Sequence, residues 1–137
     1  MRLMISEILE QTSKLKNKTE KIAFLRANYT KQLHFILEHV FNPNIKFLLP
    51  EGKPPYKPSQ TGEGQGMLYS QARKLYLFVE GGHATLKQLR REQLFIELLE
   101  SVDPKDAELL LYIKDKKLPY KNITAILIKE AFGDYNG

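Results

Sequence analysis

The sequence predicts an all-α protein with about seven helices, and three observations favour this class. Apolar residues recur every three or four positions over most of the chain, which is the spacing of one buried helix face. Capping residues, prolines and glycines stand at the ends of these periodic segments, where helices begin and end. No segment alternates apolar and polar residues in a way that convincingly predicts a strand.

Three helices are expected in the first half of the chain. A break at Lys16-Asn17-Lys18 is followed by Thr19-Glu20, which is expected to begin the second helix. Thr30 is expected to cap the third helix, which ends before Pro43 because proline cannot continue a helix. Residues 45–49 are a short apolar run, expected to pack in extended or single-turn form. The expected helices are residues 3–15, 19–28 and 30–41.

Residues 50–66 differ in kind from the segments on either side. They include four prolines and four glycines among seventeen residues and have almost no apolar content, so they cannot form a packed element. We expect a long loop that joins two helical halves of a single domain, residues 1–49 and residues 67–137.

Four helices are expected in the second half. Gly81-Gly82 suits the end of the first, and Thr85 with Gln88 resembles a capping box for the second. Asp103-Pro104 is a clear start for the third, which is apolar nearly all round and should be the buried centre of this half. Gly133 is expected to end the last. The expected helices are residues 68–79, 85–100, 104–114 and, opening at Lys121 or Asn122, a helix ending at residue 132.

Composition excludes several classes of protein. At 42% hydrophobic residues the 137-residue chain can bury a core, and with no cysteine it has no disulfide, thiol catalyst or thiolate-bound metal. No apolar run is long enough to span a bilayer, and Glu7 and Glu10 interrupt the only segment placed where a signal peptide would lie. We therefore expect a cytoplasmic protein. The net charge of +5 favours a polyanionic partner only if the positive residues cluster.

No constellation typical of an enzyme is found in the sequence. His34 and His39 are five residues apart, which places them on different faces of a helix, and there is no HExxH pattern. GEGQG at residues 62–66 does not follow a strand or end in Lys-Ser/Thr, so it is not a phosphate-binding P-loop. We expect no catalytic residue, no cofactor and no metal site.

Basic residues cluster at the turn before the last helix. Lys114 and Lys117 can be explained as residues that complement the C-terminal end of a helix dipole. Lys121 cannot, because it stands at the positive start of the next helix, where backbone N–H groups bind anions. The cluster comprises Lys114, Lys116, Lys117 and Lys121, and it is the strongest candidate for contact with phosphates.

Further basic groups lie elsewhere in the chain. Lys87, Arg90 and Arg91 share one helix face through their i, i+3, i+4 spacing, and they are expected to extend the contact surface. Arg73-Lys74 and the run of lysines between residues 14 and 21 are two more groups. Each group alone is more often a solvated helix face than a binding site.

The order of segments resembles the N-terminal helical DNA-binding domain of ATP-dependent DNA ligases, above all the short form in T-even-type phage ligases. The likeness runs from ISEILEQTSKLKNKTEKIAFLRAN through LHFILEHVFNPNIKFLL to DPKDAELLLYIKDKKLPYKNITAILIKEAF. It implies that the basic turn lies on duplex DNA, and that Asn122 joins the four lysines of that turn as a phosphate contact. Two departures stand out: Pro119 is found where ligases usually have glycine, and the Lys-x-Asp-Gly adenylation motif is absent, so ligation is not expected.

A closer resemblance is to small uncharacterised proteins of T4-like tailed phages, through NPNIKFLLPEG, MLYSQARKLY and IKDKKL. This resemblance implies the cytoplasm of an infected host cell as the location but brings no function with it. We expect a non-enzymatic accessory protein of phage DNA metabolism that binds the backbone of double-stranded DNA without reading sequence. The alternative is a protein-binding regulator that docks on a host or phage enzyme, with the proline-rich loop at residues 50–66 as its contact. A virion component is a third class that leaves no mark in the sequence.

Overall fold

The computed structural model describes residues 3–59 and 67–135, and these residues confirm the all-α class. The described part of the chain contains seven α-helices, one 3-10 helix and one isolated β-bridge. No helix in this part is both long and apolar enough to cross a membrane. The helices are α1 (Ile5–Lys14), α2 (Lys18–Ala27), α3 (Lys31–Phe41), α4 (Met67–Gln71), the 3-10 helix η1 (Ala72–Phe78), α5 (Gln88–Ser101), α6 (Pro104–Lys114) and α7 (Ala125–Phe132).

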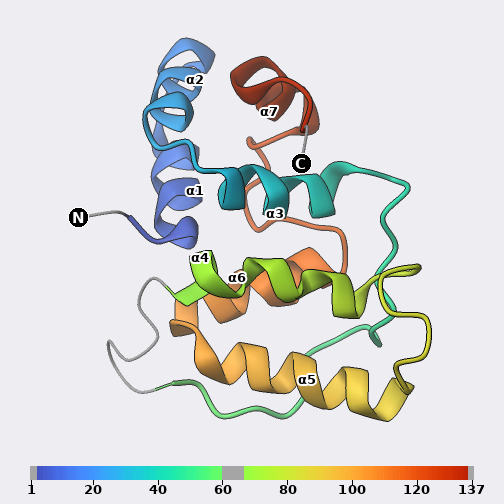
Figure 1. Cartoon of the computed structure of the whole chain (residues 1–137). Helices are drawn as coiled ribbons and strands as arrows, with labels where there is room; N and C mark the ends of the chain where they lie inside the picture. Colours follow the sequence, from blue (N-terminus) through green and yellow to red (C-terminus); the bar gives the residue numbers. More distant parts are fainter. Residues whose placement is uncertain (1–2, 60–66, 136–137) are drawn as a thin grey trace.

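Helix α6 lies at the centre of the molecule, as its sequence predicts. It contacts α1, α3 and α5, and it buries Ala107, Leu109, Leu110 and Ile113 in the core. Figure 1 shows α5 at one end of the molecule and the pair α2 and α7 at the other, with α3 and α6 between them. A side chain on α5 is therefore remote from one on α7.

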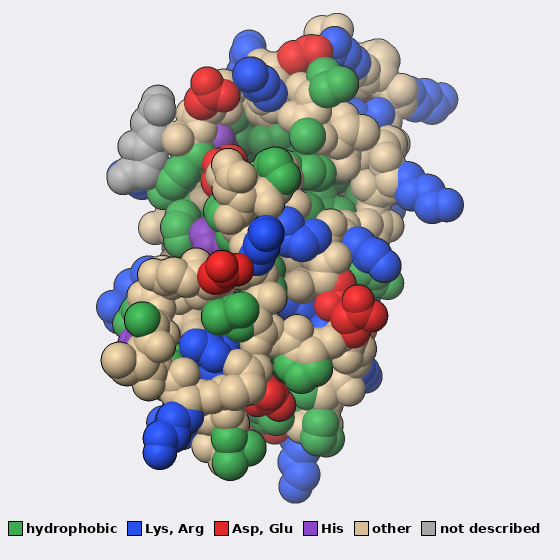
Figure 2. Space-filling model, turned by 90° about the vertical axis from the view of Figure 1, so that its right-hand side faces the viewer, with side chains coloured by type: hydrophobic (Ala, Val, Ile, Leu, Met, Phe, Trp, Pro, Cys, Tyr) green, Lys and Arg blue, Asp and Glu red, His purple; other side chains and the backbone are tan. Residues whose placement is uncertain are grey.

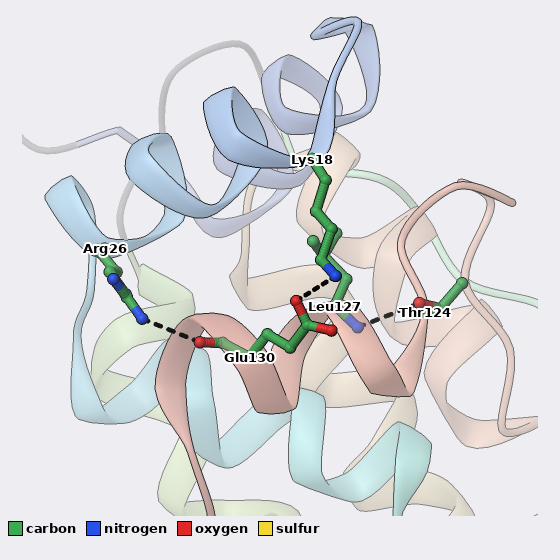
Figure 3. Close-up of polar contacts among 5 residues, drawn as sticks. All are labelled: Lys18, Arg26, Thr124, Leu127 and Glu130. Atoms are coloured by element: carbon green, nitrogen blue, oxygen red, sulfur yellow. Dashed lines mark hydrogen bonds and ion pairs between the residues drawn. The ribbon is translucent and has the colours of Figure 1, made fainter.

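The last helix packs on the first half of the chain. Arg26 of α2 donates from Nε to the carbonyl oxygen of Ala131 at 2.9 Å and from Nη2 to that of Glu130 at 3.0 Å, at the C-terminal end of α7. Lys18 forms an ion pair with the Glu130 carboxylate (Figure 3). These contacts cross from residues 67–137 to residues 1–49, so α7 covers α2 and α3 of the N-terminal segment.

Three predicted helix ends are confirmed. The Thr30 side chain accepts a hydrogen bond from the Leu33 amide at 3.1 Å and caps α3. Asp103 caps α6 by accepting from the Lys105 amide at 2.9 Å, and Gly133 ends α7 with a φ of 75°. That φ lies in the left-handed region, which glycine adopts without steric cost.

Three predicted starts are wrong. Asn17, not Thr19, caps α2 by accepting from the Glu20 amide at 2.8 Å. Helix α5 begins after Lys87, whose side chain makes no capping hydrogen bond. The capping box expected at Thr85 and Gln88 therefore does not form. Helix α7 begins after Thr124, whose hydroxyl accepts from the Leu127 amide at 3.2 Å (Figure 3), rather than at Lys121 or Asn122.

The helix expected at residues 68–79 divides into α4 and η1, which then leads into extended chain. There Phe47 and Val79 form an antiparallel bridge, with the Leu48 amide donating to the Phe78 carbonyl at 2.7 Å. Of the two forms expected for residues 45–49, extended or single-turn, the structure shows the extended one. Gly82 lies so close to the Tyr76 carbonyl that a Cβ would overlap it, which explains glycine at this position.

The first part of the proline-rich loop lies along α5 and α6. The Lys57 amide donates to the Glu100 carboxylate at 2.7 Å, and the Ser59 hydroxyl donates to the Val102 carbonyl at 3.0 Å. At the other end of this stretch, the Lys114 ammonium donates to the Pro50 carbonyl at 2.9 Å, so residues 50–59 are held against the molecule at both ends. Residues 60–66, which include the GEGQG segment, lie outside the described residues.

Asp106 is a fully buried carboxylate at the junction of α6 and α1. Its Oδ1 accepts from the Ser6 amide in the first turn of α1 at 3.0 Å. Among the described residues, neither Asp106 Oδ2 nor Ser6 Oγ has a hydrogen-bond partner. Burial raises the pKa of the Asp106 carboxyl above its ordinary value, although the hydrogen bond from the Ser6 amide acts in the opposite direction.

Replacing Asp106 by asparagine is expected to stabilise the protein by about 1 kcal/mol at pH 7, because the buried group then no longer ionises. A raised native pKa means that the folded protein binds more protons than the unfolded chain, so the stability that Asp106 contributes is present in acid and is lost as pH rises through the native value. The gain from Asp106→Asn should therefore shrink as pH falls toward 3.8, the ordinary value for the group. Urea denaturation of both proteins across this pH range measures the difference. A gain that is constant with pH would contradict the expectation.

Candidate nucleic-acid interface

Lys114 does not face solvent. Its side chain is 2% exposed, and the ammonium donates to the Pro50 carbonyl at 2.9 Å and to the Asp115 carboxylate at 2.8 Å. The lysine thus fastens the start of the proline-rich loop to the end of α6. The ammonium thus already has two partners within the protein, which does not favour the predicted contact with phosphate.

Lys116 also has an internal role. Its ammonium donates to three carbonyl oxygens at the end of α3 and in the segment that follows: those of His39 at 2.5 Å, Asn42 at 2.8 Å and Ile45 at 2.8 Å. Helix C-termini leave carbonyls without intrahelical partners, and a cation there also complements the helix dipole. The site predicted for phosphate is occupied by backbone oxygens of the protein itself.

Of the three basic residues predicted to share a face at the start of α5, Arg91 is buried, whereas Lys87 and Arg90 are exposed. Arg91 is 6% exposed, and its guanidinium donates to the Leu77 carbonyl at 3.0 Å and to Gln88 Oε1 at 2.6 Å. Lys87 and Arg90 are exposed, and Arg90 pairs with Glu97 at 3.4 Å. Figure 1 shows α5 at the opposite end of the molecule from α7, so these two residues lie away from the start of α7.

The exposed members of the predicted turn are Lys117, Lys121 and Asn122. Asn122 donates from Nδ2 to the carbonyl oxygen of Ser13 at 2.6 Å, a contact between residues 109 positions apart. Ser13 lies in the last turn of α1, next to Lys14 and close to Lys16. The fold therefore joins two of the basic groups found in the sequence. We call the exposed residues Lys14, Lys16, Lys117, Lys121 and Asn122 the basic turn surface.

The start of α7 adds backbone donors to this surface. Residues 124–126 are exposed, and they form the N-cap and the first two positions of an eight-residue helix. The first amide groups of a helix have no intrahelical acceptor, and together with the dipole they favour a negatively charged ligand. Lys121 precedes this helix start by only a few residues. The chemistry of the surface suits phosphate oxygens.

A groove beside the turn carries a further lysine that the sequence reasoning missed. Its volume is about 450 Å³, and its lining includes Lys46 and Lys117 as well as Lys114 and Lys116. Glu51 and Asp115 also line it, so the groove is only moderately positive. Lys46 lies in the apolar run at residues 45–49, and no local pattern in the sequence links it to a turn some seventy residues later.

The wider surface does not form one continuous basic patch on the face that Figure 2 shows. Lys and Arg side chains are spread over this face from end to end, and Asp and Glu side chains lie between them. Lys14 of the basic turn surface is itself 3.7 Å from Glu10, with both side chains largely exposed. Any phosphate contact is therefore local to the turn, rather than a property of the whole molecule.

The histidines give no metal site among the described residues. His34 Nδ1 contacts the Tyr29 hydroxyl at 3.2 Å, and His39 Nδ1 contacts the Phe35 carbonyl at 2.8 Å. Burial lowers the pKa of both imidazoles, so the neutral forms are favoured. No group of three or more possible metal ligands is found in residues 3–59 and 67–135.

Comparison with known proteins identifies one family. Residues 8–120 match a family whose description reads "Family of unknown function (DUF6433)". No curated protein and no solved structure match the chain. The resemblances to ligase DNA-binding domains and to T4-like phage proteins therefore remain predictions.

Proposed function

The chain belongs to the DUF6433 family of unknown function, and from its surface we propose that it binds the phosphate backbone of double-stranded DNA without sequence preference. The observation that supports this proposal is the Asn122–Ser13 hydrogen bond of 2.6 Å, because it unites two basic segments that are distant in the sequence. Non-specific DNA binding arises from lysines and helix N-termini that neutralise phosphates, and it needs no base contacts.

The proposed contacts are the exposed groups of the basic turn surface. Lys117 follows the end of α6, Lys121 precedes the start of α7 by a few residues, and Lys14 and Lys16 lie at the end of α1, where Asn122 contacts Ser13. Lys114, Lys116 and Arg91 are left out of the proposal because their charges are bonded inside the protein. The resemblance to phage proteins suggests a role in phage DNA metabolism in the cytoplasm of an infected cell, where the protein would act as an accessory factor without catalysis.

Duplex binding is expected to weaken steeply as salt is added. Four neutralised phosphates give a slope of log K against log salt of about −3.6. Replacing Lys117 and Lys121 by glutamate should lower the affinity at least about tenfold and bring the slope to about −1.8. Fluorescence anisotropy with a labelled duplex, titrated at several salt concentrations, measures both quantities.

The matched control is the Lys87→Glu/Arg90→Glu variant, which changes the net charge by the same amount on α5, away from the start of α7. It should bind nearly as well as the unchanged protein. Equal losses in both double variants would overturn the assignment to the basic turn surface. Absence of duplex binding at low salt would overturn the function itself. A protein partner retained from infected cells after nuclease treatment would then favour the alternative, a protein-binding regulator.

A further inference from the structure

A second groove lies on a different part of the molecule and has a different chemical character. Its volume is about 470 Å³, it is open to solvent, and it runs between the start of α3, the junction of α4 with η1, and Tyr135. The volume lies within the range of about 300–1,000 Å³ that is typical of ligand sites. The lining residues are Lys31, Gln32, Phe35, Tyr69, Ser70, Ala72, Arg73 and Tyr135.

Aromatic rings line this groove. The rings of Phe35 and Tyr135 lie 5.8 Å apart between centroids at an angle of 55°, and both residues are half-buried. Tyr69 is 6% exposed and donates its hydroxyl to the Leu3 carbonyl at 2.6 Å, so its ring is fixed in place. Fixed or half-buried rings offer faces and edges on which a planar group can stack at low entropic cost.

The charged groups that line the groove are all positive. Lys31 and Arg73 are exposed, and no carboxylate of the described residues lines the groove, unlike the groove beside Lys117, which includes Glu51 and Asp115. A ligand that suits the groove therefore combines a planar aromatic part with a negative charge. Because the groove is open rather than enclosed, it suits a segment of a chain better than a small molecule that must be surrounded.

We infer that this groove binds single-stranded nucleic acid, with a base stacked on Phe35 and Tyr135 and the adjoining phosphates held by Lys31 and Arg73. Stacking on aromatic side chains combined with cations along the backbone is the general mode of sequence-tolerant single-strand binding. The inference is separate from the proposed duplex contact, since the two surfaces share no residue. A protein with both surfaces would engage DNA where a duplex meets an unpaired strand.

Two neighbouring residues of η1 provide the test. Arg73 and Lys74 are both exposed and adjacent in sequence, but only Arg73 lines the groove. Arg73→Glu is expected to weaken binding of a short labelled oligothymidylate about tenfold in anisotropy titrations, whereas Lys74→Glu, with the same change in net charge, should weaken it at most about twofold. Equal losses in the two variants would overturn the inference.

A spectroscopic variant tests the stacking itself. The chain contains no tryptophan, so Tyr135→Trp introduces a single indole whose emission reports on the groove. Oligothymidylate is expected to quench this emission as it binds, and Tyr135→Ser should bind about tenfold more weakly. Emission that is unchanged at saturation would overturn the inference. The Lys117→Glu/Lys121→Glu variant, built on Tyr135→Trp, should keep the quenching, so failure of duplex binding and failure of single-strand binding are distinguished.

Discussion

Replacing Lys116 by methionine is expected to lower the free energy of unfolding by about 3 kcal/mol. The substitution keeps most of the aliphatic stem and removes the ammonium, which leaves the carbonyls of His39, Asn42 and Ile45 without their common donor. Hydrogen bonds to a charged group contribute about 1.5–3 kcal/mol each, and partial exposure reduces their sum. Urea denaturation followed by circular dichroism measures the change.

Two further variants distinguish the contribution of the Lys116 ammonium to stability from that of the backbone conformation at this residue. Lys116 has a φ of 61°, which is uncommon for a residue with a side chain. Lys116→Gly removes the same hydrogen bonds but relieves this left-handed strain, so it should cost about 1 kcal/mol less than Lys116→Met. Lys117→Met, at the exposed neighbouring position, should change stability by less than about 0.5 kcal/mol. If Lys116→Met resembled Lys117→Met, the internal role of Lys116 would be refuted.

The Arg91→Met variant is expected to lose about 3 kcal/mol of stability. Besides its bonds to Leu77 and Gln88, the guanidinium donates to the carbonyls of His83 at 3.4 Å and Leu86 at 3.3 Å. It therefore joins the end of η1, the following turn and the first residue of α5. Without it, partly buried carbonyls lose their donor, and the turn at residues 79–87 should open more often.

Hydrogen exchange of the amides in that turn, together with urea denaturation, measures the effect. Arg90→Met is the matched control, because Arg90 is exposed and its guanidinium forms an ion pair with the exposed Glu97 at 3.4 Å. It should cost less than about 0.5 kcal/mol. Arg91→Lys should recover less than half of the loss, since an ammonium cannot reproduce the fork of a guanidinium. Equal effects of Arg91→Met and Arg90→Met would contradict the expectation.

The parts of the fold that the sequence predicted correctly depend on local chemistry. Thr30 and Asp103 cap the amides that follow them within three residues, and Gly133 adopts a φ that favours glycine. Such interactions are complete within one helical turn, so a short window of sequence contains all their members. Thr85 shows the limit of this reasoning. Thr85 and Gln88 have the spacing of a capping box, but α5 begins at Gln88 and the box does not form.

The burial and bonding of the predicted site residues depend on distant partners. The residues next to a lysine near a helix end do not show whether its ammonium is exposed to solvent or bound to a distant carbonyl. The Lys114 ammonium, for example, binds a carbonyl 64 residues away. Sequence therefore found the basic groups but could not sort Lys116 and Arg91, which stabilise the fold, from Lys117 and Lys121, which are exposed. The Asn122–Ser13 contact cannot be predicted from the sequence either, because no periodicity connects residues 109 positions apart.

The packing of α7 on α2 has a consequence for biosynthesis. Arg26 and the Ala131 carbonyl that it binds are 105 residues apart in the sequence. During translation, α2 and α3 leave the ribosome long before α7, the helix that covers them, has been made, so part of their apolar surface stays exposed in the meantime. Contacts of such separation slow folding and prolong the exposure of partly folded chain. The docking of α7 on α2 is therefore expected to be a late step in folding, because it requires about a hundred further residues to be synthesised after α2.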